Sequence, residues 1–313
     1  MLVVEDIASP VAGRGQVVIK IKATALNFFD TLIIENKYQF KPDMPFSPGA
    51  EIAGEILHLG EDVSGFQIGE RVMAYVSWGG CREEIAVAAE KLVKIPDGIE
   101  FKVAAGLTVT YGTTYHGLKD RAELQEGETL AVLGASGGVG QSAIELGKVM
   151  GARVIAAASS DDKLEFCRSI GADDLVNYSS ENLKERLKEL TGGAGVDVIY
   201  DPVGAEYSEQ ALRAIAWQGR FLVVGFAAGE IPRIPLNLTL LKGCQIVGVF
   251  WGAFAKRSPQ ADQANMAQIM RWVQEGRLNP HIHREYTLGQ TADALQALAN
   301  REIKGKAVII PGS

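Results

Sequence analysis

The stretch LGASGGVGQSAIELG, residues 133–147, passes from an apolar run through a glycine cluster into a helix-forming segment. The residues before it are apolar and β-favouring, and apolar residues recur after it at helical intervals. Gly134, Gly137 and Gly140 are spaced three apart, which lets a backbone turn tightly and approach a pyrophosphate closely. The helix start then offers unpaired N–H groups and the positive end of its dipole to that anion. The stretch predicts a strand–turn–helix corner that holds a dinucleotide.

Strands and helices alternate along the chain after this corner. The apolar run ARVIAAASS at 152–160 is followed by a helix from about Asp162 to Ile170 and by a third strand near DLVNY at 174–178. Glycine spacing alone is equally typical of an ordinary turn. The β-α-β-α-β order favours the dinucleotide, because a nucleotide-binding half-sheet requires it.

Length and composition limit the classes of protein that the chain can represent. Its 313 residues suffice for two domains, and 47% hydrophobic with 22% charged residues is typical of a globular protein. A net charge of -7 argues against a nucleic-acid surface. Cys81, Cys167 and Cys244 are far apart, which indicates reduced thiols. With no apolar run long enough to span a bilayer and no basic start, we expect a cytoplasmic protein.

The pattern of elements changes twice along the chain. Short alternating strands broken by Gly and Pro run to about Asp97, and helices with parallel strands follow from about Ala104 to Gly243. In the last part we expect strands at VGVFWGAF (247–254), EYTLGQ (285–290) and GKAVIIP (305–311). Helices are expected at 260–275 and 291–300. We therefore predict an α/β protein in which a β-rich domain, residues 1–108 and 245–313, is split around a doubly wound parallel-sheet domain, residues 109–244.

The end of the second strand of the doubly wound domain distinguishes the two nicotinamide cofactors, because an acidic residue there binds the ribose diol and repels a 2′-phosphate. Ser159 and Ser160 stand where that acid is expected, and Lys163 follows within reach of a phosphate. Asp161 and Asp162 complicate the assignment, although they fit equally well as cap and first-turn residues of the next helix. The segment favours NADPH over NADH.

A series of motifs runs through nearly the whole chain in a specific order. They are ALNFFD (25–30), ENKYQF (35–40), PFSPGAEIAGEI (45–56), GFQIGERV (65–72), LVKIPDGI (92–99), GTTYHGL (112–118), LQEGETLAVLGASGGVG (124–140), IGADDLVNY (170–178), GVDVIYDPVG (195–204) and GKAVIIP (305–311). In this order the chain resembles the zinc-independent, zeta-crystallin-like quinone oxidoreductases of the medium-chain dehydrogenase/reductase superfamily. The resemblance implies a GroES-like β-barrel domain split in sequence around a Rossmann domain, with an active site in the cleft between them.

The resemblance also implies roles in NADPH binding for individual residues. The residues that it places around the 2′-phosphate are Ser159, Lys163, Tyr178 and Arg301. At the pyrophosphate it places Gly137, Gly138 and Val139, which lie in the same corner as Gly134 and Gly140. It also implies that Lys306 reaches toward the phosphates. Those that it places at the nicotinamide are Thr113, Phe226, Ala227, Phe250 and Trp251. Taken alone, the aromatic side chains Tyr178, Phe226 and Phe250 are more typical of ordinary packing.

The zinc ligands of related dehydrogenases are missing. Relatives that use zinc have a cysteine where this chain has Asn27 and a His-Glu pair where it has Ala50 and Glu51. Zinc selects thiolate and imidazole ligands, and alanine supplies neither. His281 and His283 have a weakly metal-like spacing, but no third ligand joins them nearby in sequence. We expect no metal ion.

Hydride transfer without a Lewis acid suits acceptors that conjugation already polarises, namely quinones and α,β-unsaturated carbonyls. We expect Asn27 and Tyr38 to donate hydrogen bonds to the acceptor, with Tyr38 or water as the proton donor. Taken alone, Asn27 also fits a turn and Tyr38 a rim aromatic. Leu32 stands where several quinone reductases have a tyrosine, which makes the pocket more apolar and weakens the case for quinones.

Two other functions and one assembly stay open. An enoyl- or acryloyl-thioester reductase of the same superfamily would need a cationic groove for a coenzyme A phosphate, and the acidic chain shows none. A non-catalytic crystallin-like or RNA-binding protein that retains NADPH is the other alternative, although the negative charge weighs against RNA. The segment VGVFWGAF either pairs across a two-fold axis, giving a homodimer, or forms a buried internal strand.

Overall fold

The structure is a computed structural model that describes residues 2–312. It divides into two compact units. The first unit comprises Met1–Val109, Met270–Gly276 and Pro280–Ser313, and the second comprises Thr110–Ile269 and Arg277–Asn279.

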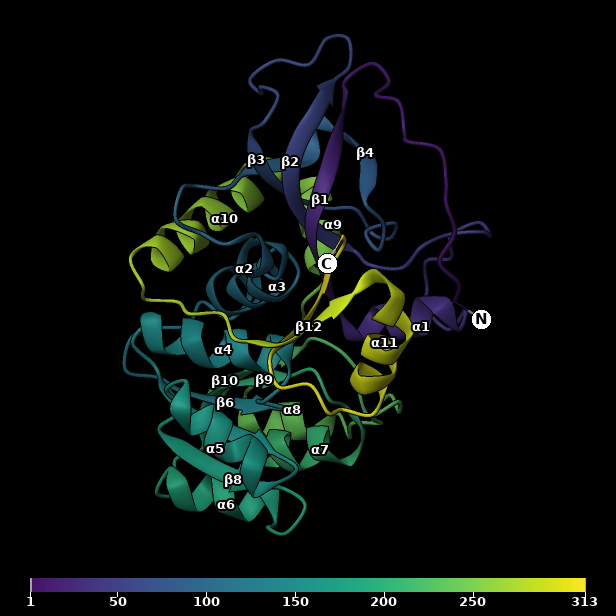
Figure 1. Cartoon of the computed structure of the whole chain (residues 1–313). Helices are drawn as coiled ribbons and strands as arrows, with labels where there is room; N and C mark the ends of the chain where they lie inside the picture. Colours follow the sequence, from purple (N-terminus) through teal and green to yellow (C-terminus); the bar gives the residue numbers. More distant parts are fainter. Residues whose placement is uncertain (1, 313) are drawn as a thin grey trace. The chain divides into compact units, whose positions relative to one another are not determined.

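The first unit is built on a seven-stranded sheet in the order β12-β13-β1-β2-β3-β5, with β4 also paired to β1. Its strands are β1 (Gln16–Leu26), β2 (Glu51–Leu59), β3 (Arg71–Tyr75), β4 (Glu84–Ala88), β5 (Leu92–Lys94), β12 (Ile282–Thr287) and β13 (Lys306–Ile310). All pairs are antiparallel except β12 with β13. Figure 1 shows the long strands β1 and β2 side by side. The C-terminal strands therefore complete a sheet that the N-terminal segment begins, as the split-domain prediction requires.

Alternation in β1 explains how this sheet forms its core. Val17, Ile19 and Ile21 are buried at every second position and pack with Ile52 and Val72 of the neighbouring strands. Short helices cover or connect the strands: α1 (Phe28–Ile34), η1 (Ala89–Lys91), α2 (Phe101–Ala105), η3 (Leu288–Gln290) and α11 (Thr291–Ala299).

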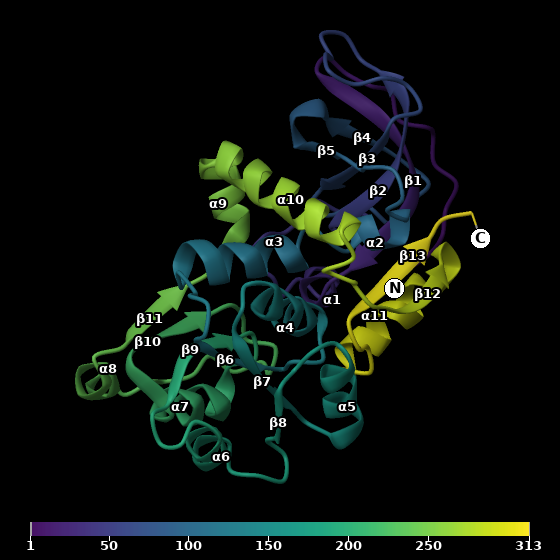
Figure 2. The same ribbon diagram turned by 90° about the vertical axis from the view of Figure 1, so that its left-hand side faces the viewer.

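The second unit confirms the predicted doubly wound sheet. Six parallel strands lie in the order β11-β10-β9-β6-β7-β8. They are β6 (Thr129–Leu133), β7 (Arg153–Ala158), β8 (Asp174–Asn177), β9 (Val196–Asp201), β10 (Ile215–Val223) and β11 (Gln245–Gly248). Figure 2 shows α4 on one side of this sheet and α6 with α7 on the other. The central strands are almost wholly buried, because helices cover both faces of a parallel sheet.

The helices of the second unit occupy the intervals between its strands and the segment before β6. They are α3 (Thr110–Tyr115), the π-helical turn η2 (His116–Arg121), α4 (Gly138–Val149), α5 (Asp161–Ser169), α6 (Leu183–Leu190), α7 (Ala205–Arg213), α8 (Asn237–Lys242), α9 (Trp251–Arg257) and α10 (Pro259–Gln274), the last with residues in both units. Within residues 2–312, no helix has the length and apolar character needed to cross a membrane.

The second unit extends beyond the predicted boundary at residue 244. Strand β11 pairs in parallel with β10, so Gln245–Gly248 belongs to the sheet of the second unit. The prediction of a strand throughout VGVFWGAF is wrong at its end, because α9 begins at Trp251. The Trp251 indole is buried, and its Nε1 donates a hydrogen bond to Asp262 Oδ1 at 2.7 Å. That tertiary contact outweighs the β propensity of the aromatic residues.

The turn from β1 into α1 is held by a buried carboxylate. Asp30 accepts the Asn27 N–H at 2.8 Å and the Gly49 N–H at 3.2 Å. Burial raises the pKa of the Asp30 carboxyl to about 7, while these N–H groups and the Lys306 ammonium oppose the rise and Glu51 adds to it. The folded chain therefore binds a proton at Asp30 that the unfolded chain has already released above about pH 4.

This raised pKa predicts a pH-dependent stability. The stabilisation that proton binding to Asp30 contributes is fully present below pH 3.8 and is lost as the pH rises through about 7. Between pH 5 and pH 8 we expect the free energy of unfolding of the native chain to fall by roughly 2 kcal/mol more than that of Asp30→Asn. Urea denaturation at both pH values measures the difference, with Asp43→Asn at an exposed position as control. A difference that stays constant with pH would contradict the prediction.

Candidate functional site

The register of the parallel sheet in the second unit brings three predicted cofactor segments to one edge. Leu133 at the end of β6 pairs with Ala157, and Ala158 at the end of β7 pairs with Asn177. The glycine corner, Ser159 and Tyr178 each follow one of these strand ends. The carboxyl edge of a doubly wound sheet is where such folds bind ligands, next to the position at which the strand order reverses, here between β6 and β9.

In the glycine corner, the fold requires glycine at Gly134 and Gly140 but not at Gly137. Gly134 has φ +57°, and a Cβ there would lie 2.8 Å from Val203 Cγ2. A Cβ on Gly140 would lie 2.4 Å from the carbonyl oxygen of Gly134. A Cβ on Gly137 would meet only that same oxygen at an ordinary 3.5 Å. Packing within the chain therefore does not explain Gly137, whereas close approach of a ligand does.

Helix α4 starts directly at this open position. Gly137 is its N-cap, and Gly138 and Val139 are its first two residues. The first N–H groups of a helix have no acceptor within the helix and attract anions. The three residues predicted to contact the pyrophosphate therefore lie together at the start of a twelve-residue helix.

Ser159 and Lys163, predicted at the 2′-phosphate, lie together after β7. Lys163 Nζ is 3.3 Å from Ser159 Oγ, and both side chains are half-buried. Asp161 is the first residue of α5, and its carboxylate accepts a hydrogen bond from Asn177 Nδ2 at 2.7 Å. This contact favours the helix-start interpretation of that acid.

Tyr178 has an aromatic partner that the sequence does not reveal. Its ring centroid lies 4.5 Å from that of Tyr207 in the first turn of α7, and both rings pack against the core of the unit. Since 29 positions separate the two tyrosines and no motif links them, only the fold brings them together.

The residues predicted at the nicotinamide differ in exposure. Phe226 follows β10 with 38% of its surface exposed, and Phe250 follows β11 with 51% exposed. Trp251 is only 5% exposed, and its ring lies 3.0 Å from where a Cβ on Gly112 would stand. Thr113 is the one residue of α3 that is not buried. Exposure therefore suits Thr113 and the two phenylalanines for ligand contact, whereas Trp251 anchors α9.

Ala227 and Arg301 complete the predicted cofactor set. The Ala227 N–H donates to the Pro202 carbonyl at 3.0 Å, which ties the loop after β10 to the end of β9. Arg301 lies in the first unit, in the turn between α11 and β13, where its φ is +60°.

In the first unit, Asn27 belongs to a buried polar cluster with Glu51 and Lys306. Lys306 Nζ lies 2.7 Å from Asn27 Oδ1, 2.7 Å from Glu51 Oε1 and 2.9 Å from the Leu26 carbonyl oxygen. Asn27 Nδ2 donates to Glu51 Oε1 at 2.9 Å. The second carboxylate oxygen of Glu51 accepts the Val109 N–H at 2.7 Å. The resemblance implied that Lys306 reaches toward the cofactor phosphates, and the structure places its ammonium among these three acceptors.

Strand register explains why these distant residues meet. In β2, Glu51 pairs with Ala25 of β1 and with Tyr75 of β3. Leu26 of β1 pairs with Ala307 of β13, next to Lys306. One end of the sheet therefore collects the first residues of β2 and β13.

Two tyrosines face the same charges. Burial raises the pKa of Tyr38, and Asp30 adds to the rise. Burial also raises the pKa of Tyr75, with smaller contributions from Tyr38, Asp30 and Glu51. The Tyr38 ring stacks on Phe29 with centroids 5.4 Å apart. Both hydroxyls therefore stay protonated near neutral pH, as hydrogen-bond donors must. No pattern in the sequence singles out Tyr75, which only the pairing of β3 with Glu51 of β2 brings to this cluster.

The donor set does not fit a zinc ion. Among residues 2–312, no group of three or more His, Cys, Asp or Glu side chains is placed to hold a metal. Where zinc-dependent relatives have ligands, Asn27 and Glu51 instead share the Lys306 ammonium. His281 and His283 have ring centroids 6.4 Å apart, and burial together with nearby positive charge lowers the pKa of each.

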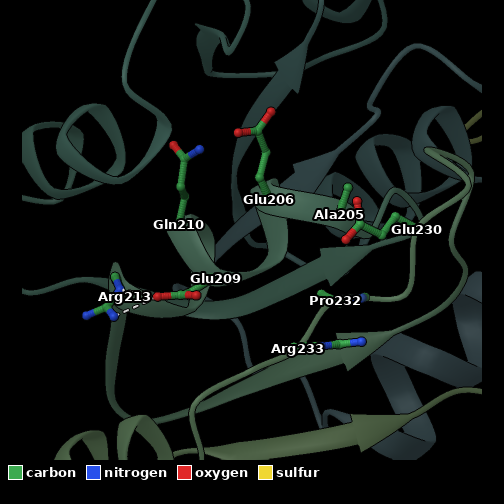
Figure 3. A pocket seen from close by; sticks show the side chains of 8 residues that line it. All are labelled: Ala205, Glu206, Glu209, Gln210, Arg213, Glu230, Pro232 and Arg233. Atoms are coloured by element: carbon green, nitrogen blue, oxygen red, sulfur yellow. Dashed lines mark hydrogen bonds and ion pairs between the residues drawn. The ribbon is translucent and has the colours of Figure 1, made fainter.

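A surface hollow of about 410 Å³ in the second unit is lined by α7 and the segment 230–233. Figure 3 shows Glu206 and Gln210 pointing to the same side, with Arg213 joined to Glu209. None of the residues predicted to bind cofactor or acceptor lines this hollow.

Comparison with known proteins identifies both parts of the chain. Residues 13–97 match the model of the alcohol dehydrogenase GroES-like domain, and residues 138–274 match the model described as zinc-binding dehydrogenase. These matches confirm the predicted fold class: a GroES-like domain and a Rossmann parallel sheet.

Relatives that match nearly the whole chain show which family within this fold class it belongs to. The quinone oxidoreductase-like protein 2 homolog of Nematostella vectensis is 40% identical over 98% of this chain and 85% of its own length. A probable oxidoreductase from Mycobacterium abscessus has 36% identity and a TM-score of 0.89, covering 98% of this chain and 93% of its own. The quinone oxidoreductase of Escherichia coli, solved in complex with NADPH, has 25% identity and a TM-score of 0.90, covering 98% and 95%. The chain belongs to the quinone oxidoreductase-like proteins of the medium-chain dehydrogenase/reductase superfamily.

Proposed function

We propose that this chain uses NADPH to reduce quinones or α,β-unsaturated carbonyl compounds without a metal ion. The observation that carries the proposal is the Lys163 ammonium beside the Ser159 hydroxyl at the end of β7. An acidic side chain at this position would bind the ribose diol of NADH, whereas an ammonium and a hydroxyl suit a 2′-phosphate. The NADPH complex of the Escherichia coli relative supports the same cofactor.

The cofactor fits the residues of the second unit. The start of α4 would receive the pyrophosphate at Gly137, Gly138 and Val139, and Tyr178 would complete the 2′-phosphate site. In this proposal Lys306 stays with Asn27 and Glu51, because its ammonium already has three acceptors. Bound NADPH supplies a hydride, which is two electrons with one proton.

The first unit supplies the hydrogen-bond donors for the acceptor. As hydride adds to the conjugated system, negative charge develops on the acceptor oxygen, and the Asn27 amide and Tyr38 hydroxyl stabilise it by donation. A second proton, from Tyr38 or from water, completes a hydroquinone or a saturated carbonyl product. Leu32 is half-buried on α1 and gives the acceptor an apolar contact rather than another hydroxyl.

We also propose that the chain forms a homodimer through β11, the edge strand of the Rossmann sheet. Side chains near this edge are apolar and exposed: Trp217 (70%), Leu240 (80%), Leu241 (67%) and Ile246 (39%). An uncovered sheet edge with apolar neighbours favours pairing with another strand. A second copy of the chain would continue the sheet and cover these side chains.

The cofactor and acceptor assignment predicts a selective effect of Lys163→Glu. The substitution removes a charge-assisted hydrogen bond and places a like charge beside the 2′-phosphate. We expect the Kd for NADPH to rise about 100-fold and that for NADH only a few-fold. Fluorescence titration measures binding, and stopped-flow oxidation of each cofactor with a panel of quinones and enones measures turnover.

Lys184→Glu on α6 is the control, because that lysine pairs with Glu185 at an exposed position. If Lys163→Glu raises the Kd for NADPH and NADH equally, Lys163 does not bind the 2′-phosphate. If the native chain reduces no acceptor faster than background, the proposed reaction is wrong whatever the cofactor preference.

The glycine corner predicts opposite effects for two alanine substitutions. Gly137→Ala meets no atom of the chain closer than 3.5 Å, so we expect a loss of stability of at most about 1 kcal/mol, from the poorer N-cap, and a Kd for NADPH raised about tenfold by the lost close approach. Gly140→Ala puts its Cβ 2.4 Å from a carbonyl oxygen, so we expect a loss of stability of about 1–3 kcal/mol. Unchanged NADPH binding in a folded Gly137→Ala would separate this corner from the pyrophosphate.

The proposed dimer predicts that Leu240→Glu gives a monomer. Leu240 is exposed on α8, so the charge leaves the isolated chain folded but opposes an apolar interface. Analytical ultracentrifugation measures the assembly, with Val11→Glu at another exposed apolar position as control. A Leu240→Glu variant that stays dimeric would exclude this face.

A further inference from the structure

We propose that Lys306 is a positioning residue for the acceptor: its buried ammonium orients and polarises the Asn27 amide, so that one Nδ2 hydrogen serves the acceptor oxygen. This inference rests on the proposed function. In a site that holds no metal ion, the Lys306 ammonium would then supply the fixed positive charge near the acceptor.

The ammonium has no hydrogen left for a phosphate. An ammonium has three hydrogens, and Lys306 Nζ has three acceptors, the Leu26 carbonyl, Asn27 Oδ1 and Glu51 Oε1, at 2.7–2.9 Å. The residue is 3% exposed. Its alkyl chain is confined as well, because a Cβ on Gly106 would lie 3.4 Å from Lys306 Cγ. The side chain is therefore fixed in this unit.

The neighbours of the Asn27 amide distinguish its oxygen from its nitrogen. The oxygen faces an ammonium at 2.7 Å, which can only donate, and the nitrogen faces the Glu51 carboxylate at 2.9 Å, which only accepts. Rotating the amide by 180° would set N–H groups against the ammonium and oxygen against oxygen. Charge on both sides therefore enforces one orientation. Nδ2 has two hydrogens, and one hydrogen bond from it is present.

Glu51 balances the charge of the Lys306 ammonium. Its carboxylate is fully buried and accepts from Asn27, Lys306 and the Val109 N–H. Glu51 and Lys306 each begin a strand, β2 and β13, so the pair is held by the sheet rather than by loops. Groups fixed on regular elements keep their geometry while charge develops on a substrate.

Polarisation links the ammonium to the acceptor. Hydrogen bonds in series strengthen one another, and the low dielectric of a buried site increases the effect. The chain Nζ–H to Oδ1 and Nδ2–H to the acceptor oxygen is such a series, with the positive charge at its far end. The amide is thereby a stronger donor to the developing oxyanion than an unassisted asparagine.

The test replaces both charges at once, because removing Lys306 alone would leave Glu51 buried without a partner. In Glu51→Gln/Lys306→Met we expect kcat with a quinone to fall about 100-fold, the size of effect seen when one oxyanion donor is lost. The Kd for NADPH should stay within about twofold of the native value. Lys102→Met, which breaks an exposed pair with Glu285, is the control and should leave kcat unchanged.

A double-mutant cycle shows whether the effect passes through Asn27. In an Asn27→Ala background the double substitution should lower kcat only about two- to threefold further, because the group that Lys306 polarises is already gone. A full 100-fold loss in that background would overturn the proposal. So would a Kd for NADPH raised about tenfold with unchanged kcat, which would make Lys306 a phosphate ligand.

A readout without turnover separates this inference from the proposed reaction. In protein labelled with ¹⁵N at asparagine, the Asn27 side-chain amide hydrogen that Glu51 accepts should exchange slowly in the native chain and much faster in Glu51→Gln/Lys306→Met. Equal exchange rates would overturn the positioning role even if quinones are reduced. If the Asn27 amide exchanges slowly in the native chain but no acceptor is reduced, the amide is fixed as proposed while the proposed reaction is wrong. In that case the role of the amide in the reaction is wrong as well.

Discussion

The acceptor site that we propose depends on one buried ion pair, between the Lys306 ammonium and the Glu51 carboxylate 2.7 Å away. Burying two charges costs free energy that only close pairing and complete hydrogen bonding offset. Three segments meet that requirement together: the end of β1 supplies Leu26 and Asn27, β2 begins with Glu51, and β13 begins with Lys306. The sheet register of the first unit and the orientation of the Asn27 amide are therefore two consequences of the same interaction.

In the second unit, the cofactor recognition that we propose depends on where parallel strands end. Strand register aligns the glycine corner, Ser159 and Tyr178 at one edge of the sheet. A glycine that internal packing does not demand and a lysine beside a serine then suit a pyrophosphate and a 2′-phosphate. The chemistry that we propose follows from both sets of residues: a cofactor site that would suit a 2′-phosphate, and an acceptor site in which the Lys306 ammonium would supply a fixed positive charge.

Much of this could be predicted from the sequence because it is local. The glycine corner is a strand–turn–helix signal, and Ser159 and Lys163 are four positions apart, one helical turn. Lys306 and Glu51 are 255 positions apart, so only the sheet brings them together, and the resemblance alone implied a role for the lysine at the cofactor phosphates. The strand predicted at the end of VGVFWGAF was wrong, since the hydrogen bond from Trp251 to Asp262 favours a helix where local propensity favours a strand. The raised pKa of Asp30 depends on burial, which no local pattern reveals.

Neutron diffraction from crystals of the NADPH-bound chain, grown near pH 7 and exchanged into deuterium oxide, would locate the hydrogens of the ion pair and of the Asn27 amide. We expect three deuterons on Lys306 Nζ, directed at the Leu26 carbonyl, Asn27 Oδ1 and Glu51 Oε1. We also expect two deuterons on the Asn27 amide atom that faces Glu51 and none on the atom that faces Lys306. A neutral Lys306 amine, or amide deuterons on the side facing Lys306, would contradict this expectation.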